Sequence, residues 1–257
     1  MLFCGAMLNK RCMERVRESR YDNAIKQTIR QAKQVPVLIN YTVGGKRAEK
    51  TLDKSDLALI AKIDNSDIPY WFPTDRMIEG NETKRHDSVG ITHAHHFYTK
   101  RSLWALGALY DKAFKSQHKL SIFLVQYAAL GFSKISRYVS NHFSQVNRYL
   151  SGTLWIASQQ AEVSPDHILN GKLQRFVKHE APKFGKIKVA LIGCCDSSAF
   201  PILSETFDYI FIDPPFGANL NYSELNFLWE QWLKVWTNNK PEAIINKIGR
   251  ASCRERV

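Results

Sequence analysis

The chain carries an acidic residue, two prolines and an aromatic residue in succession, Asp213-Pro214-Pro215-Phe216, directly after the almost wholly apolar run 207–212. The exocyclic amino group of a base is a poor nucleophile, because its lone pair is conjugated into the ring. Hydrogen bonds from its two N–H groups to the Asp213 carboxylate and the Pro214 carbonyl would localise that lone pair. Pro215 stiffens the loop, and Phe216 can stack on a base that has left its helix. The four residues indicate modification of a base amino group; the alternative is an ordinary turn that ends a strand.

Elements that end at one edge of a sheet must position such a loop, and the sequence after residue 150 has that pattern. Strand patterns at 153–158, 187–193 and 207–212 alternate with helix patterns at about 164–179 and 222–236. This alternation predicts an α/β fold with a mostly parallel, doubly wound sheet, in which ligands bind at the carboxyl ends of the strands. The last helix has an apolar stripe that we interpret as core packing. The stripe consists of Leu225, Leu228, Trp229, Trp232 and Trp236.

The first 150 residues mix helix patterns with a β-hairpin. The patterns predict a basic helix over 13–33, followed by a hairpin over 35–51 that turns at Gly44-Gly45. They next predict a helix that has Ser55 as its N-cap, ends at Lys62 and buries Leu57, Leu59 and Ile60. Irregular structure over 64–89, a helix with Thr99 as its N-cap and a second helical stretch over 120–148 complete this part.

A net charge of +12 favours a polyanionic partner, most often nucleic acid. Basic and aromatic residues alternate between Lys134 and Tyr149, which suits contact with a phosphate backbone and its bases. An amphipathic helix with a solvated basic face is the alternative. The sequence has no run of about 18 apolar residues and no secretory h-region, so we expect a cytoplasmic protein without a membrane segment.

The sequence Asp213-Pro214-Pro215-Phe216 after an apolar strand resembles the catalytic motif of S-adenosylmethionine-dependent amino-methyltransferases of DNA. The longer string 213–233 is similar to a bacterial group of DNA methylases that carry a zinc ribbon, as are the segments 90–101 and 4–6. The resemblance implies that the four motif residues are catalytic, that S-adenosylmethionine is the cofactor and that DNA is the partner. Aspartate at the first motif position implies adenine N6 rather than cytosine N4. The implied fold is a partial Rossmann-like sheet with a helical and β-hairpin insert.

The sequence Gly193-Cys194-Cys195-Asp196 resembles the acidic turn at a strand end in this family. Asp196 would then accept a hydrogen bond from the adenine of the cofactor, or it could cap the turn through its own backbone. The Gly-rich cofactor loop of the family has no counterpart, because the 257 residues contain no Gly-x-Gly. We therefore expect this chain to be a fragment that is inactive alone.

The two ends of the chain carry signals of their own. Residues 1–12 predict a zinc-ribbon remnant, because Cys4-Gly5-Ala6 matches half of a zinc knuckle; an ordinary buried cysteine is the alternative. Residues 248–257 match the translation of a sequencing adapter, and we expect them to be a non-native tail. Between the ends we assign 13–150 to an insert that recognises the DNA target, and 151–247 to the C-terminal part of the catalytic domain.

Four histidines, His86, His93, His95 and His96, raise the question of a metal site. No carboxylate or cysteine stands at a spacing that would complete one, so we expect no metal. Positioning, phosphate contact or core packing are the roles that we expect of these side chains.

The sequence thus predicts a fragment of a DNA adenine methyltransferase. Two other substrates fit the same motif, RNA and the amide of a protein glutamine. The second is disfavoured because that family usually carries Asn at the position of Asp213. Outside the enzymes, the alternative is a basic nucleic-acid-binding module with a degenerate methylase domain.

Overall fold

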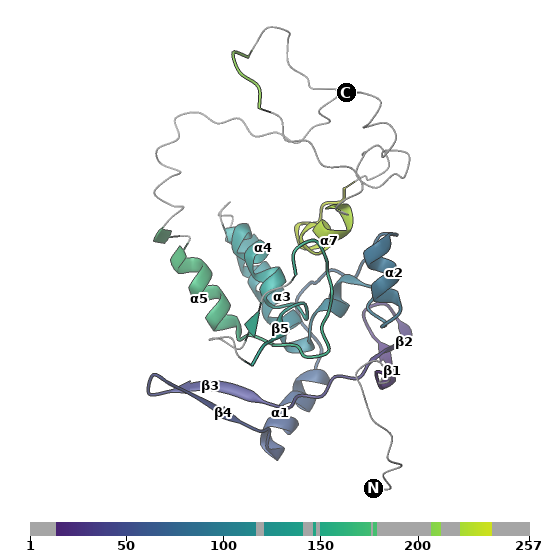
Figure 1. Ribbon diagram of the computed structural model, residues 1–257, viewed down its shortest axis with the longest axis vertical. Coiled ribbons are helices and arrows are strands. Elements are labelled where there is room, and N and C mark those ends of the chain that lie inside the picture. Colours follow the sequence, from purple (N-terminus) through teal and green to yellow (C-terminus); the bar gives the residue numbers. More distant parts are fainter. Residues whose placement is uncertain are drawn as a thin grey trace.

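The computed structural model describes residues 14–116, 121–140, 146–147, 150–175, 177–178, 207–211 and 222–237. The helices are α1 (Lys54–Asp64), α2 (Asn81–Asp87), the 3₁₀ helix η2 (Ala94–Phe97), α3 (Lys100–Lys115), α4 (Ser121–Gly131), α5 (Pro165–Arg175) and α7 (Tyr222–Leu233). The strands are β1 (Arg17–Asp22), β2 (Gln27–Ala32), β3 (Ile39–Val43), β4 (Lys46–Lys50), β5 (Arg137–Tyr138) and β6 (Val146–Asn147). Figure 1 shows α3, α4 and α7 together at the centre, with the β1–β2 and β3–β4 hairpins on opposite sides.

The described strands pair only as antiparallel two-stranded sheets, β1 with β2, β3 with β4 and β5 with β6. The fold is therefore a mixture of helices and small antiparallel sheets, and the doubly wound parallel sheet is not found in this part of the chain. Of its three expected strands, 187–193 lies outside the described residues. None of the described helices is long and apolar enough to span a bilayer.

The other two expected strands are corrected by the structure. Residues 153–157 have no regular secondary structure, and the Leu154 N–H donates to the Glu82 carboxylate at 3.0 Å rather than to a neighbouring strand. Residues 207–211 also form no strand, and Phe211 is 79% exposed. An apolar run becomes a buried strand only where other strands cover it, and the described residues place none beside 207–211.

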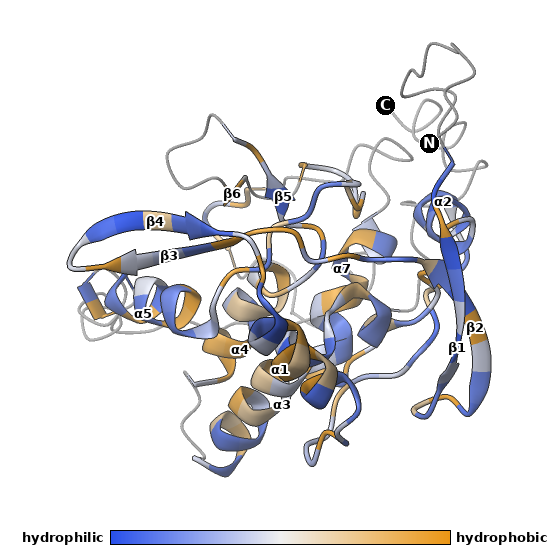
Figure 2. Ribbon diagram, turned by 90° about the horizontal axis from the view of Figure 1, so that it is seen from below, coloured by the Kyte–Doolittle hydropathy of each residue, from blue (hydrophilic) through white to orange (hydrophobic). Residues whose placement is uncertain are grey.

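A hairpin replaces the basic helix expected over 13–33. Strands β1 and β2 pair from Arg17–Ala32 to Asp22–Gln27, and Lys26 takes a positive φ of 54° where the chain reverses. The segment has no apolar stripe that would hold a helix against the core. Figure 2 accordingly shows β1 as mainly hydrophilic.

The β3–β4 hairpin confirms the expectation for 35–51, with Gly44 and Gly45 at φ +57° and +77° in the turn. Such values match the two-residue hairpin turn that favours glycine. Helix α1 also forms, but its N-cap is Asp53, whose carboxylate accepts the Ser55 and Asp56 N–H groups at 2.8 and 2.9 Å. Its apolar side chains do not reach the core, since α1 buries none of its residues.

The core lies between η2, α3, α4 and α7. Thr99 is the N-cap of α3, as expected, and accepts the Ser102 N–H at 3.3 Å. The stripe of α7 packs inward as predicted, with Leu228 and Trp232 fully buried, although Trp236 beyond its end is 54% exposed. Helix α5 confirms most of the helix expected at 164–179.

Two segments of the first 150 residues differ from expectation. Helix α2 interrupts the irregular stretch 64–89. Helix α4 ends at Gly131, and the short strands β5 and β6 follow where the helical pattern was extended to 148. The alternating basic and aromatic residues therefore do not share one helical face.

Candidate functional site

The predicted catalytic residues Asp213, Pro214, Pro215 and Phe216 lie outside the described residues, as does Asp196. The residues on both sides of the motif are described: 207–211 before it, and α7, which begins six residues after Phe216. Residues 1–12 and 248–257 also lie outside the described part. The placement of α7 is therefore the structural fact closest to the motif.

Glu224 in the first turn of α7 fastens that helix to α2. Its carboxylate is 1% exposed and accepts the backbone N–H groups of Asn81, Glu82 and Thr83 at 3.0, 2.7 and 3.0 Å. The first N–H groups of a helix have no partner within it, so a carboxylate from another element supplies the missing acceptors. The start of α7 and the start of α2 are thereby held together.

Gly80 leaves the space that this carboxylate occupies. A Cβ at Gly80 would lie 2.1 Å from the Glu224 carboxyl carbon. At the other end of α7, the Trp232 Nε1–H donates to the Tyr98 hydroxyl at 3.1 Å. Burial raises the pKa of that hydroxyl, so Tyr98 stays neutral. These contacts join α7 to α2 and to the residue that follows η2.

The histidine segment meets a carboxylate that lies more than 70 residues earlier in the chain. Asp22 Oδ2, at the end of β1, is 2.8 Å from His95 Nε2 and 2.9 Å from His96 Nε2. Asp22 Oδ1 accepts the Ala24 N–H at 3.0 Å. Burial by itself would raise the pKa of the Asp22 carboxyl, but the hydrogen bonds from both histidines outweigh it and hold that pKa well below its usual range.

These three side chains have the composition of a metal site, with one ligand atom each within 4.8 Å of the others. The proton positions argue for a different role. His96 Nδ1 faces the backbone N–H groups of Thr92 and His93 at 3.2 and 3.4 Å, so it must accept. A neutral imidazole has one N–H, which here stands on Nε2 and points at Asp22. That nitrogen has no lone pair for a metal, whereas a ligating histidine donates through its other nitrogen.

The cluster therefore docks the hairpin. Three further contacts support it: Gln31 Nε2 donates to the Gly90 carbonyl at 2.8 Å, Arg17 donates to the Ser88 carbonyl at 2.6 Å, and the Ala32 N–H reaches the Val89 carbonyl at 3.4 Å. Gly90 has φ +80°, and a Cβ there would lie 2.1 Å from the Arg30 carbonyl oxygen. Polar contacts and a close approach of the two backbones thus hold the β1–β2 hairpin against the rest of the fold, and an apolar face is not what holds it.

The buried histidines make stability depend on pH. Burial lowers the pKa of His96 to about 3, although Asp22 acts in the opposite direction, and burial also lowers the pKa of His86 and of His93. Below the unfolded value of 6.5 the unfolded chain binds protons that the folded chain does not, so stability falls as pH falls. We expect the lowered pKa of His96 alone to reduce the free energy of unfolding by about 2 kcal/mol between pH 7.5 and pH 5.

Urea unfolding at pH 7.5, 6.2 and 5 measures this loss. His96→Gln should reduce the dependence on pH, and His167→Gln, at an exposed position of α5, should leave it unchanged. The Asp22 carboxyl does not add to the pH dependence of stability between pH 7.5 and 5. The stability that its lowered pKa provides is lost only when the pH falls below the pKa of an unfolded aspartate. A free energy of unfolding that is constant from pH 7.5 to 5 would contradict the burial of neutral histidines.

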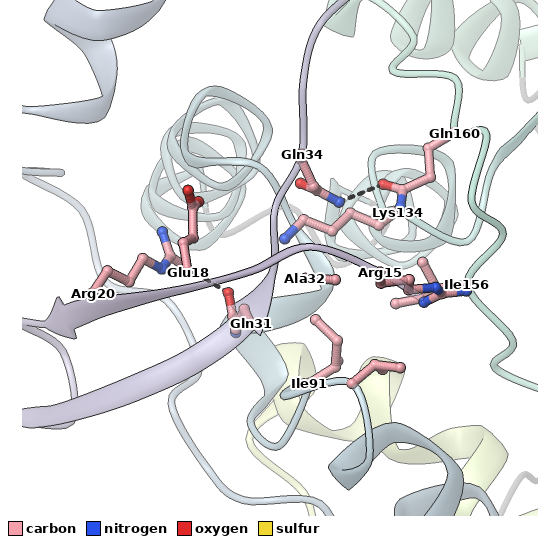
Figure 3. A pocket seen from close by; sticks show the side chains of 11 residues that line it. Arg15, Glu18, Arg20, Gln31, Ala32, Gln34, Ile91, Lys134, Ile156 and Gln160 are labelled. Carbon is pink, nitrogen blue, oxygen red and sulfur yellow. Dashed lines mark hydrogen bonds between the residues drawn. The ribbon is translucent and has the colours of Figure 1, made fainter. Parts of the chain in front are cut away.

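A cavity of about 80 Å³ opens beside the docked hairpin, between β1–β2, residues 89–91, Lys134 and residues 156–160. Figure 3 shows the Lys134 side chain pointing toward the hairpin, below the hydrogen bond from Gln34 to Gln160. Lys134 is 8% exposed, and its ammonium donates to the His96 carbonyl at 2.9 Å. Burial lowers the pKa of Lys134 to about 7. The sequence pattern placed Lys134 among basic residues expected on the protein surface, but its side chain is buried.

Three basic residues of α3 also have contacts within the chain. Lys100 donates to the Asp64 carbonyl at 2.8 Å, and Arg101 pairs with Glu162 at 2.5 Å. Lys115 pairs with Asp111 at 2.7 Å. Three arginines stand together at the β1–β2 hairpin, where Arg15, Arg17 and Arg30, with Glu14, line a second hollow of about 390 Å³.

Three residues of this region, Asp22, Arg20 and Glu224, were not singled out from the sequence, whereas Lys134 was named among the basic residues that suit phosphate contact. Lys134 had a local signal, since it is the one charged residue between Leu120 and Ser136. Glu224 is an acidic residue amid the apolar stripe of α7, which also marks it. Asp22 and Arg20 carried no such mark, because their contacts are made across more than 70 residues of chain or with the opposite strand.

No family model, curated protein or solved structure matches this chain.

Proposed function

We propose that this chain is part of an S-adenosylmethionine-dependent methyltransferase that modifies the exocyclic amino group of a DNA base, adenine N6. The observation that carries the proposal is the sequence Asp213-Pro214-Pro215-Phe216 directly before α7. A catalytic loop must be held still relative to its substrate, and a buried helix is a suitable anchor for it. Glu224 and Trp232 provide that anchor.

In this proposal the motif residues act on the base. The Asp213 carboxylate and the Pro214 carbonyl accept hydrogen bonds from the amino group and localise its lone pair. Phe216 stacks on the extruded base and offsets part of the cost of unstacking it. The stacking energy and the unstacking cost are each about a few kcal/mol. Asp196 accepts a hydrogen bond from the cofactor.

S-adenosylmethionine would supply the methyl group. The two described cavities do not fit it: one is about 80 Å³, against roughly 300 Å³ or more for sites of small molecules. The other is lined by three arginines and Glu14, which disfavours a sulfonium cation. The proposed binding residue is Asp196, outside the described part of the chain.

Methylation of duplex DNA tests the proposal. The product of the reading frame that encodes this chain is incubated with labelled S-adenosylmethionine and mixed-sequence duplex DNA, and the digested nucleosides are separated by mass. We expect N6-methyladenine from that product, and none from residues 1–257 alone, which lack a Gly-x-Gly loop. Label in RNA or in protein glutamine, with none in DNA, would contradict the DNA assignment.

A second candidate function is a basic nucleic-acid-binding module without catalysis. The observation that favours it is the set of arginines along the β1–β2 hairpin, beside the buried Lys134. It predicts that the product of the reading frame binds DNA but transfers no methyl group in the same assay.

A further inference from the structure

The cavity beside the hairpin is unusually rich in cations for its size. Of its eleven lining residues, Arg15, Arg20 and Lys134 are cationic and Glu18 is the one acid. Three amides, Gln31, Gln34 and Gln160, add hydrogen-bond donors. Such a lining attracts a small anion and can donate to several of its oxygens.

Lys134 makes the strongest case for an anion. Its ammonium has three N–H donors, and the contacts of the described residues give it one acceptor, the His96 carbonyl. No carboxylate among them lies within 4.0 Å of it. A buried ammonium without a counter-charge is costly. A bound anion would remove that cost and use the two N–H groups left over.

The arginines are available as well. Arg20 has one described hydrogen bond, to Gln31 Oε1 at 3.0 Å, and is exposed. Arg15 is exposed and lines both this cavity and the larger hollow. Guanidinium groups bind phosphate oxygens in a bidentate manner, so each can complete the coordination that Lys134 begins.

Size and continuity select the ligand. A cavity of about 80 Å³ has room for one tetrahedral group but not for a nucleoside. The hollow of about 390 Å³ that shares Arg15 extends the cationic surface to Arg17 and Arg30. A row of sites along one hairpin suits a polymer of phosphates better than a single free ion.

We propose that the cavity formed by Arg15, Arg20 and Lys134 binds one backbone phosphate of duplex DNA, and that the β1–β2 hairpin lies along that backbone. The identity of the partner as DNA rests on the proposed function. Inorganic phosphate offers the same chemistry, and the experiment separates the two sources.

The experiment measures the affinity of the chain for a fluorescent 16-base-pair duplex by anisotropy at two salt concentrations. The variants are Lys134→Met and Arg20→Gln, with Lys46→Met, on the far hairpin and exposed, as the matched control. We expect on the order of a tenfold loss of affinity for each of the two variants, and a salt dependence smaller by about one counter-ion. The control should bind as the unchanged chain does.

Folding and binding are separated by a second measurement. Lys134→Met removes the desolvation cost of a buried ammonium but also the donor to the His96 carbonyl, and because these two effects oppose each other the temperature of thermal unfolding should change little. Loss of DNA affinity in a variant that is as stable as the parent therefore reports on the site itself.

The pH dependence of binding gives an independent readout. With its pKa lowered to about 7, Lys134 is charged at pH 6 and largely neutral at pH 8, whereas a phosphodiester does not titrate there. Arg20 and Glu18 face this region from β1, Asp64 from the end of α1, and Glu162 from the loop before α5. We expect weaker DNA binding at pH 8 than at pH 6, and a smaller difference in Lys134→Met.

Two results would overturn the inference. One is an unchanged duplex affinity in both Lys134→Met and Arg20→Gln. The other is saturable binding of inorganic phosphate that is lost in these variants while their duplex affinity is unchanged, which would assign the cavity to the free ion. Duplex binding that depends on Lys134, together with no methyl transfer by the product of the reading frame that encodes this chain, would support the inference and contradict the proposed enzyme.

Discussion

Replacing Asp213 by alanine in the product of the reading frame that encodes this chain should lower methyl transfer to DNA by at least about 10²- to 10³-fold, the usual effect of removing one group that stabilises a transition state. The carboxylate is the acceptor that draws the amino nitrogen toward a tetrahedral geometry in the proposed mechanism. Its removal leaves the base bound but its lone pair conjugated. The measurement is label transferred to duplex DNA per unit time at saturating substrate.

The matched control is Asp208→Ala, five residues earlier, where the side chain is exposed. It should transfer methyl groups at the unchanged rate. Affinity for duplex DNA and thermal stability should be similar in all three proteins, which assigns the effect to chemistry. A rate in Asp213→Ala equal to that of the parent would show that this aspartate is not catalytic and that the motif is an ordinary turn.

Replacing Glu224 by alanine should lower the free energy of unfolding by about 3–4 kcal/mol, because it leaves three backbone N–H groups at the start of α2 without an acceptor. Glu224→Gln keeps the shape and one carbonyl oxygen, so its loss should be smaller. The measurement is urea unfolding at pH 7.5, with Asn226→Ala, exposed on the same helix, as a control expected within about 0.5 kcal/mol of the parent.

The same contact connects stability to the proposed site. The motif stands only a few residues before α7, so loosening the first turn of that helix should also affect the segment that carries Asp213. We expect Glu224→Ala, made in the product of the same reading frame, to lower methyl transfer even at a temperature where that variant remains folded. A free energy of unfolding in Glu224→Ala within 1 kcal/mol of the parent would show that α2 and α7 are not held by this carboxylate.

Local rules were sufficient where the chain decides its conformation over a few residues. The Gly44-Gly45 turn specified the β3–β4 hairpin, Thr99 specified the start of α3, and the spacing of Leu228 and Trp232 specified the buried face of α7. Positive φ at a hairpin turn, an N-cap hydroxyl and a helical apolar period act on neighbours in sequence. Each is therefore visible before the chain is folded.

The same rules failed where a distant segment supplies the partner. The helical interpretation of 13–33 could not include the docking of Asp22 on His95 and His96, and Leu154 was assigned to a strand although its N–H binds Glu82. A short apolar run, or a polar run without a clear period, is compatible with several conformations. The one adopted depends on which acceptors and surfaces the rest of the fold brings to it.

The sequence by itself determined the motif Asp213-Pro214-Pro215-Phe216 and the basic character of the chain. It also determined the hairpin turn at Gly44, the start of α3 at Thr99 and the apolar stripe of α7. Only the tertiary structure decided that Lys134 is buried beside the hairpin arginines, and that Asp22 completes the histidine cluster while the proton on His96 Nε2 makes it a docking contact. The physical reason is that burial and hydrogen-bond partners are properties of positions in space. Residues more than 70 positions apart acquire them only when the chain has folded.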